Sequence, residues 1–393
     1  MLTSIALIFS FGLLGGWIFK KIKLPSILGM IIVGIILSPY ALNLLDDSIL
    51  NISADLRKFA LIIILMRAGL TLNISDLKKV GRPAFCMCFL PACCEIIGYT
   101  ILAPIFLNIS YAEAALLGSV IAAVSPAVVV PRMINLIENK YGTKEGIPQM
   151  ILAGASADDV FVIVLFTSFT SLVQNGNMSV LNLLSIPVSI VMGIILGIIT
   201  GLIFSEICKK VEIKNSIKII IILSICFFFC QIESSLDGIL PISSLIAVMI
   251  FGCVLYKKVP AIAKKLSGGF NALWTGGEIL LFVLVGALVD LSYAYTAGVA
   301  VIILVLLCLI FRVTGVSLCL AKTKVKFKER LFCMGAYLPK ATVQAAIGGV
   351  PLSLGLACGQ TVLTSAVISI IITAPLGAIF IDKTYKKLLK KDN

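Results

Sequence analysis

Residues 154–166 read Gly-Ala-Ser-Ala-Asp-Asp-Val-Phe-Val-Ile-Val-Leu-Phe, and the interpretation of the whole chain depends on its two adjacent carboxylates, Asp158 and Asp159. The run around them is otherwise apolar and long enough to cross a bilayer. A charged side chain at membrane depth costs at least about 2.5–3.5 kcal/mol, even on a lenient insertion scale. Two neighbouring carboxylates also repel each other. The pair is therefore expected to have a function that offsets this cost, and exchange of a cation for protons is the first candidate.

The composition supports the membrane interpretation. Of the 393 residues, 60% are hydrophobic and only 13% are charged, and the mean hydropathy is +1.13. A soluble domain has roughly 25% charged residues, so a buried helix end in a soluble core is the weaker interpretation of the Asp pair. The net charge of +13 does not indicate nucleic-acid binding, because the basic residues form short clusters between apolar runs. No cleavable signal peptide is expected, because the first charges follow the first apolar run.

The sequence gives no indication of a resident metal or cofactor. The twelve cysteines lie mostly inside apolar runs and the chain has no histidine, so the cysteines are interpreted as small hydrophobic residues. Without histidine, any pH response must come from carboxylates or lysines. No P-loop motif is present, which indicates that an ion gradient rather than ATP drives transport.

Apolar stretches of about 20 residues predict an all-α, polytopic fold with about thirteen spans. These are 2–20, 24–45, 57–75, 82–107, 112–136, 147–173, 180–207, 216–232, 238–256, 272–290, 294–321, 328–350 and 357–382. Most of the 32 basic residues fall on alternate loops, among them Lys20, Lys78, Lys79, Arg132 and Lys383. The positive-inside rule then puts the N-terminus outside and the C-terminus in the cytoplasm.

Two predicted spans contain helix breakers at their centres. The fifth contains Ala-Val-Ser-Pro-Ala-Val-Val-Val-Pro at 123–131, and the twelfth contains Tyr-Leu-Pro-Lys-Ala-Thr at 337–342. Proline frees a backbone carbonyl, which is tolerated at membrane depth only beside protein or a water-filled cavity. The two broken spans are seven apart in order, and an odd offset inverts their orientation in the membrane. Spans 4–6 and 11–13 therefore look like inverted copies, each with a broken middle helix. That pattern is typical of transporters with a binding site near the midplane.

Several ionisable residues fall inside these spans. Arg67, Arg312 and Lys340 are basic, and Glu95 and Glu278 join the Asp pair as acids. Buried ions of both signs imply pairing between helices.

Three of these motifs resemble one family. Ser-Pro-Ala-Val-Val-Val-Pro at 125–131, the Asp pair and Pro-Lys-Ala-Thr-Val-Gln-Ala-Ala at 339–346 resemble the NHA branch of the sodium/proton antiporters. That branch belongs to the monovalent cation:proton antiporter superfamily. The resemblance extends from about Leu61 to the C-terminus and includes Met-Arg-Ala-Gly-Leu at 66–70.

The resemblance implies a membrane-embedded homodimer that works by an elevator motion. Residues 1–81 would supply dimerisation helices, and 82–173 would form the first half of a core domain. Residues 174–293 would supply a linker helix and further dimerisation helices. Residues 294–393 would complete the core and end in a short cytoplasmic tail.

The resemblance also assigns roles to single residues. Asp159 matches the carboxylate that binds the cation and the proton, and Asp158 matches its neighbour. Arg312 matches a basic position that is expected to pair with Glu95. Lys340 is expected to stabilise the second break, but animal members carry an acid near Leu288 where this chain has leucine. Its partner is therefore open, with Glu278 as a possible substitute.

The expected mechanism is competition for one site. A partly dehydrated Na⁺ or Li⁺ would bind Asp159, Ser125 and carbonyls freed at the two breaks, with Asp158 in an accessory role. The cation and the proton would compete, which couples their opposite movements. Arginine stays protonated in proteins, so Arg312 leaves Asp159 as the chief titrating group and predicts electroneutral exchange. The expected context is pH homeostasis at a cell membrane.

Other functions stay open at this stage. Potassium could replace sodium, and a channel or a cation-coupled symporter could use the same fold. An intramembrane aspartyl protease also uses two buried Asp, but these face each other across a shared proton, which adjacent residues on one helix cannot do.

Overall fold

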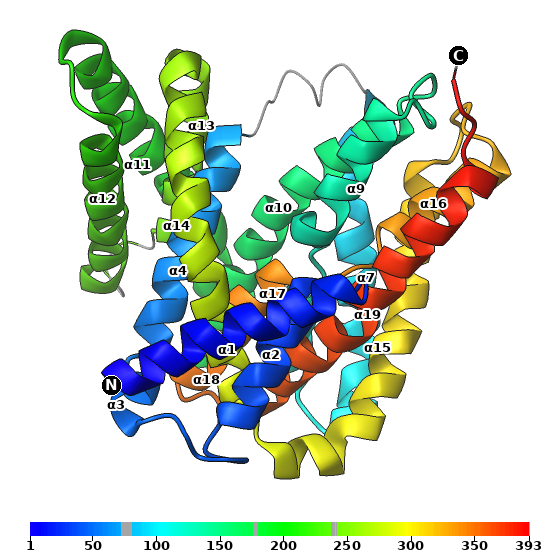
Figure 1. Ribbon diagram of the computed structural model, residues 1–393, viewed down its shortest axis with the longest axis horizontal. Coiled ribbons are helices and arrows are strands. Elements are labelled where there is room, and N and C mark those ends of the chain that lie inside the picture. Colours follow the sequence, from blue (N-terminus) through cyan, green and yellow to red (C-terminus); the bar gives the residue numbers. More distant parts are fainter. Residues whose placement is uncertain (72–80, 176–179, 237–239, 241, 393) are drawn as a thin grey trace. The chain divides into compact units, whose positions relative to one another are not determined.

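The computed structural model describes residues 1–71, 81–175, 180–236, 240 and 242–392, and within these ranges its named elements are all helices (Figure 1). They are α1 Leu2–Lys21, α2 Ser26–Leu37, α3 Asp47–Asn51, α4 Ser53–Thr71, α6 Arg82–Met87, α7 Leu90–Leu107, α8 Tyr111–Ile121, α9 Pro126–Glu138, α10 Ile147–Asn175, α11 Val180–Lys210, α12 Asn215–Ser235, α13 Ser244–Lys258, α14 Pro260–Ala287, α15 Leu291–Cys319, α16 Phe327–Ala336, α17 Thr342–Gly348, α18 Val350–Ser353 and α19 Gly359–Leu388. The predicted all-α class is confirmed. Lys78 and Lys79 of the predicted charge pattern lie outside the described residues.

The helices fit a multi-pass membrane protein. Within the described part of the chain, eight helical stretches are long and apolar enough to cross a membrane. The remaining predicted spans fall on short helices such as α2, on the interrupted α16 and α17, or on α4 and α10, which carry charged residues. The total of thirteen spans therefore stays a prediction.

The chain divides into two compact units. The first contains Met1–Ala54, Ile74–Phe169 and Ile279–Asn393, and the second contains Asp55–Asn73 and Thr170–Glu278. In the second unit, α13 packs against both α11 and α12. In the first unit, α7 packs along α15, and α19 contacts α8, α9, α15, α16 and α17. The site described below lies wholly in the first unit.

Residues 1–54 belong to the first unit, whereas the sequence analysis grouped them with the dimerisation helices. The reason is a close backbone contact between α2 and the last turns of α14. A Cβ on Gly34 would lie 2.0 Å from the Val283 carbonyl oxygen, so only glycine permits this approach. Which helices form a dimer interface stays a prediction.

The predicted pair of helix triplets is present in the trace. The first triplet consists of α6 with α7, α8 with α9, and α10, and the second consists of α15, α16 with α17, and α19. The middle helix of each triplet is interrupted at the predicted place, at residues 122–125 and 337–341. The first members of the two triplets, α7 and α15, pack against each other (Figure 1).

Local sequence explains where these helices begin. Ser110 and Glu113 form a capping box at the start of α8, with the Ser110 amide donating to Glu113 Oε2 at 2.9 Å. Asp290 caps α15 through the Ser292 amide at 2.8 Å. Pro126 stands at the start of α9, where a missing N–H costs nothing.

One predicted boundary is wrong. Residues 257–271 were expected to form a loop before a span at 272–290, but α14 is continuous from Pro260. Proline is favoured at a first helical position, and lysines such as Lys264 and Lys265 are tolerated because long side chains can reach water. Glu278, which would lie close to the start of the predicted span, is therefore in the interior of α14.

Candidate functional site

The two helix breaks meet in the first unit. The Ser125 amide donates to the Pro339 carbonyl at 2.8 Å, which joins the break between α8 and α9 to the break between α16 and α17. Residues 121–125 and 337–342 are called the helix crossing below. Because the helix is interrupted at both places, each break leaves backbone groups without helical partners, and every one of them needs another partner at this depth.

The second break is fixed by the last helix. The Lys340 amide donates to Thr373 Oγ1 of α19 at 2.9 Å. Gly377, one turn further along α19, faces Pro339, and a Cβ there would lie 2.1 Å from the Pro339 Cγ. A glycine at this position is what allows α19 to pack directly on the proline.

The carbonyls of the first break are occupied by side chains from other helices. Gln344 Nε2 donates to the Ile121 carbonyl at 2.9 Å and to the Ala123 carbonyl at 2.7 Å. Both Arg312 Nη1 and Lys340 Nζ donate to the Ala122 carbonyl. The sequence analysis proposed these freed carbonyls as cation ligands, but most of them accept hydrogen bonds from protein side chains.

Four fully buried charged side chains pair at the crossing. Arg312 Nη1 lies 2.7 Å from Glu95 Oε2, and Lys340 Nζ lies 2.5 Å from the same oxygen. Arg312 Nη2 lies 3.4 Å from Asp158 Oδ2. The partner of Lys340 is thus Glu95. The suggestion that Glu278 replaces it is wrong, because the basic residue in electrostatic range of Glu278 is Arg67 of the second unit.

The two aspartates differ in their surroundings. Asp158 is fully buried, and its Oδ2 accepts a hydrogen bond from the Val124 amide at 2.8 Å, so it ties α10 to the first break. Asp159 keeps 8% of its surface exposed, and its buried Oδ1 has no hydrogen-bond partner among the described residues. Asp158 Oδ1 is unpaired as well, but Asp158 Oδ2 is fixed by the Val124 amide and Arg312, whereas Asp159 has no ion-pair partner among the described residues.

The paired charges cancel. Arg312 and Lys340 contribute two positive charges, and Glu95 and Asp158 contribute two negative ones. Of the buried ionisable side chains described at the crossing, this leaves Asp159 without a counter-charge. A carboxylate in that position can be neutralised by a proton or by a bound cation.

Two buried hydroxyls add further oxygen. Ser125 Oγ of the first break and Thr342 Oγ1 at the start of α17 have no hydrogen-bond partner in the described chain. An unpaired buried polar atom requires an explanation, and a bound water or ion is one such explanation. Ser125 was predicted from sequence, but Thr342 and Gln344 were not singled out. The available signal was their polarity within an apolar span, directly after Pro339.

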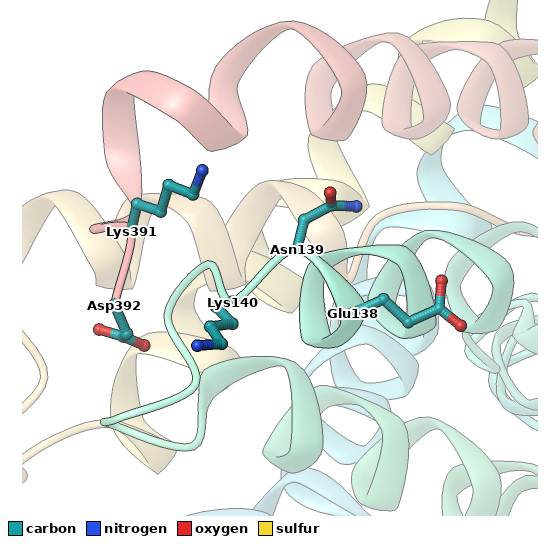
Figure 2. A pocket seen from close by; sticks show the side chains of 5 residues that line it. All are labelled: Glu138, Asn139, Lys140, Lys391 and Asp392. Atoms are coloured by element: carbon teal, nitrogen blue, oxygen red, sulfur yellow. The ribbon is translucent and has the colours of Figure 1, made fainter.

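The pocket in Figure 2 lies elsewhere, at the end of the chain. It measures ≈480 Å³ and is lined by Glu138, Asn139, Lys140, Lys391 and Asp392. Here the C-terminal residues pair with the loop between α9 and α10: the Gly142 amide donates to the Lys390 carbonyl and the Asp392 amide to the Lys140 carbonyl, each at 2.8 Å. This contact, called the tail latch below, contains none of the predicted site residues.

Comparison with known proteins gives a consistent family. Residues 6–386 match the family described as "Sodium/hydrogen exchanger, transmembrane". The chain is 30% identical to the human sodium/hydrogen exchanger 9B2, with 99% of this chain and 75% of that protein covered. It is 32% identical to the mouse sodium/hydrogen exchanger 9B1, with 99% and 72% covered.

A solved structure matches the fold. The sodium proton antiporter MjNhaP1 from Methanocaldococcus jannaschii superposes with a TM-score of 0.83 at 21% identity, covering 98% of this chain and 97% of that one. The resemblance noted from three short motifs thus extends over nearly the whole sequence and the whole fold. The chain belongs to the sodium/hydrogen exchanger family.

Proposed function

We propose that this protein exchanges Na⁺ for H⁺ across the membrane at the helix crossing, and that Asp159 binds either the cation or the proton. Its membership of the sodium/hydrogen exchanger family supports the reaction. The observation that carries the site is the charge balance: the other four buried charges at the crossing pair with one another, and Asp159 is left.

In this proposal, each group at the crossing has a separate task. The Asp159 carboxylate neutralises the cation, while Ser125 Oγ and Thr342 Oγ1 supply neutral oxygen ligands, which Na⁺ and Li⁺ accept as hard cations. The N-terminus of α9 adds a partial positive charge that favours the ionised carboxylate when the cation has left. Asp158 holds the first break in place.

Coupling follows from the competition at one carboxylate. Asp159 carries a cation in one direction and a proton in the other, and the two do not bind together. Arg312 stays charged throughout, because its guanidinium is not deprotonated in proteins. One proton then exchanges for one monovalent cation, and we infer that the exchange is electroneutral.

Alternating access is proposed to follow an elevator motion of a core domain within a homodimer. The two inverted triplets joined at the crossing form a body that such a motion would carry as one. The proposed orientation has the N-terminus outside and the C-terminus in the cytoplasm, following the positive-inside rule.

The test is exchange in proteoliposomes against an imposed pH gradient, with Na⁺, Li⁺ and K⁺ compared. Na⁺ and Li⁺ are expected to dissipate the gradient and K⁺ to do so weakly. Asp159→Asn keeps the bulk and removes the charge, so its exchange should fall to the background of empty liposomes while the protein stays folded.

The matched control is Asp158→Asn, the same change one residue earlier. Its amide oxygen can still accept from the Val124 amide, so impaired but measurable exchange is expected. Normal exchange by Asp159→Asn would refute the site. Strong K⁺ exchange with little Na⁺ exchange would instead identify a potassium/proton antiporter on the same fold.

A further inference from the structure

Gln344 bridges the two helix breaks through a single side chain. Its Nε2 donates to the carbonyls of Ile121 and Ala123 at 2.9 and 2.7 Å, and its Oε1 accepts from the Ala341 amide at 2.8 Å. The residue is fully buried. Both N–H donors of its amide are thus used on the first break, and its oxygen accepts from the second.

The two carbonyls that Gln344 holds belong to the same short segment as the proposed ligands. Ala123 precedes Val124, whose amide binds Asp158, and Ser125 follows with its unpaired hydroxyl. In a broken helix these carbonyls have no i+4 amide to bind. Without Gln344 they would be free oxygen ligands in the immediate neighbourhood of the cation.

We infer that Gln344 sets the ion selectivity of the exchanger as a positioning residue, by withholding the Ile121 and Ala123 carbonyls from the cation and fixing the spacing of the breaks. The inference rests on the proposed function. The number and field strength of coordinating carbonyls is one of the factors by which proteins distinguish K⁺ from Na⁺. A crossing with two carbonyls withheld offers few ligands and favours the smaller ion, and a crossing with two more oxygens favours the larger.

The experiment uses the full-length exchanger in proteoliposomes and measures apparent KM for Na⁺ and for K⁺. In Gln344→Met, which keeps length and removes all three hydrogen bonds, the ratio of the K⁺ KM to the Na⁺ KM should fall about tenfold, corresponding to about 1.4 kcal/mol. Gln344→Glu keeps the shape and the acceptor for the Ala341 amide but cannot supply both donors. It should shift the ratio in the same direction by a smaller factor.

Two controls separate selectivity from folding. Gln360→Met makes the same chemical change at a glutamine whose Nε2 has no hydrogen-bond partner in the described chain, and it should leave the KM ratio unchanged. Arg330→Gln removes side-chain hydrogen bonds to the Val325 and Thr323 carbonyls, outside the helix crossing, and should lower the melting temperature without a change in the ratio.

The outcomes are distinct from those for the proposed function. If the wild-type protein exchanges no cation for protons, the proposed function is wrong. If it does exchange Na⁺ but both Gln344 variants keep the wild-type KM ratio, only the selectivity role is refuted, whatever happens to stability. If neither variant can be recovered folded, Gln344 is a structural brace and the inference is likewise overturned.

Discussion

Both helix breaks interrupt the middle helix of a triplet, but their chemistry is opposite. The first, at 121–125, offers backbone groups and one hydroxyl. The second, at 337–342, is the source of Lys340, and α17 directly after it provides Gln344; both side chains reach across to the first break. In the other direction, the Ser125 amide of the first break donates a hydrogen bond to the Pro339 carbonyl of the second. The two triplets thus have a similar helix order, but their side chains differ. The first break mainly accepts hydrogen bonds through its carbonyls, and the second break with α17 supplies the side-chain donors.

This asymmetry has a consequence for mutation. Removing the Lys340 ammonium, which the second break donates to the first, should affect stability first. Removing an unpaired hydroxyl from either break leaves the paired charges in place and should affect the ion first. The predictions below test this division, beginning with the largest expected effect.

Lys340→Ala should be the most destabilising change. It leaves the Glu95 carboxylate with Arg312 alone and removes a donor from the Ala122 carbonyl. Breaking a buried ion pair typically costs about 3–5 kcal/mol. The melting temperature in detergent should drop strongly, while the apparent Na⁺ affinity of the protein that remains folded changes little. The exposed Lys386→Ala is the control; an affinity loss with unchanged melting temperature would make Lys340 a substrate ligand instead.

Ser125→Ala and Thr342→Val form a matched pair across the crossing. Each removes a hydroxyl that has no protein partner, so the melting temperature should hardly change. Each should raise the apparent KM for Na⁺, by about fivefold for a loss of about 1 kcal/mol. Kinetics and thermal unfolding measured on the same preparations check this. A lowered melting temperature with an unchanged KM would show that the hydroxyls serve packing.

Arg132→Gln should have a small effect. Arg132 of α9 forms a bidentate salt bridge with Asp382 of α19: its Nε and Nη2 each lie 3.0 Å from a carboxylate oxygen. The Asp382 side chain is 52% exposed. Exposed pairs contribute about 0–1 kcal/mol. A slight fall in melting temperature and an unchanged KM ratio are expected. A large loss of exchange would instead indicate that the pair between α9 and α19 positions the first break for transport.

The tail latch should give the smallest effect, and only in acid. The Thr143 hydroxyl and the Lys144 amide donate to Asp392 Oδ2 and hold the pKa of that carboxyl below its ordinary value. A lowered folded-state pKa stabilises the latch above the unfolded pKa, about 3.9, and this is lost as pH falls through the folded value.

Hydrogen exchange at the Gly142 amide provides the measurement, because that amide donates to the Lys390 carbonyl. Protection should exceed that of an Asp392→Asn variant from pH 5 to 8, and the difference should vanish well below pH 4. A difference that disappeared between pH 6 and 7 would contradict this assignment and make the latch a physiological pH sensor.

Much of this arrangement can be predicted from sequence because membrane depth leaves few solutions. Apolar length, the alternation of lysines and the two proline breaks predict helices, topology and repeat without any contact information. The breaks at Ser125-Pro126 and Pro339-Lys340 are where the prolines require them to be.

The allocation of partners is less predictable. Which of several acids pairs with Lys340 depends on how α7, α15 and α16 pack, and no local pattern encodes that geometry. For the same reason, the sequence analysis predicted that the freed carbonyls bind the cation. In the structure, three of them accept hydrogen bonds from Gln344, Arg312 and Lys340. The extension of α14 to Pro260 was missed because four lysines at 257–265 resemble a loop.

The central claim is that Asp159 alone exchanges its charge, while the four other buried charges at the crossing stay paired. The direct test is Na⁺-driven proton flux in proteoliposomes whose membrane voltage is clamped with K⁺ and valinomycin. One proton exchanged for one Na⁺ moves no net charge, so both the rate and the end-point of the flux should be the same at every voltage. A clear dependence of either on voltage would mean that a second group in the crossing also titrates, and would contradict the account.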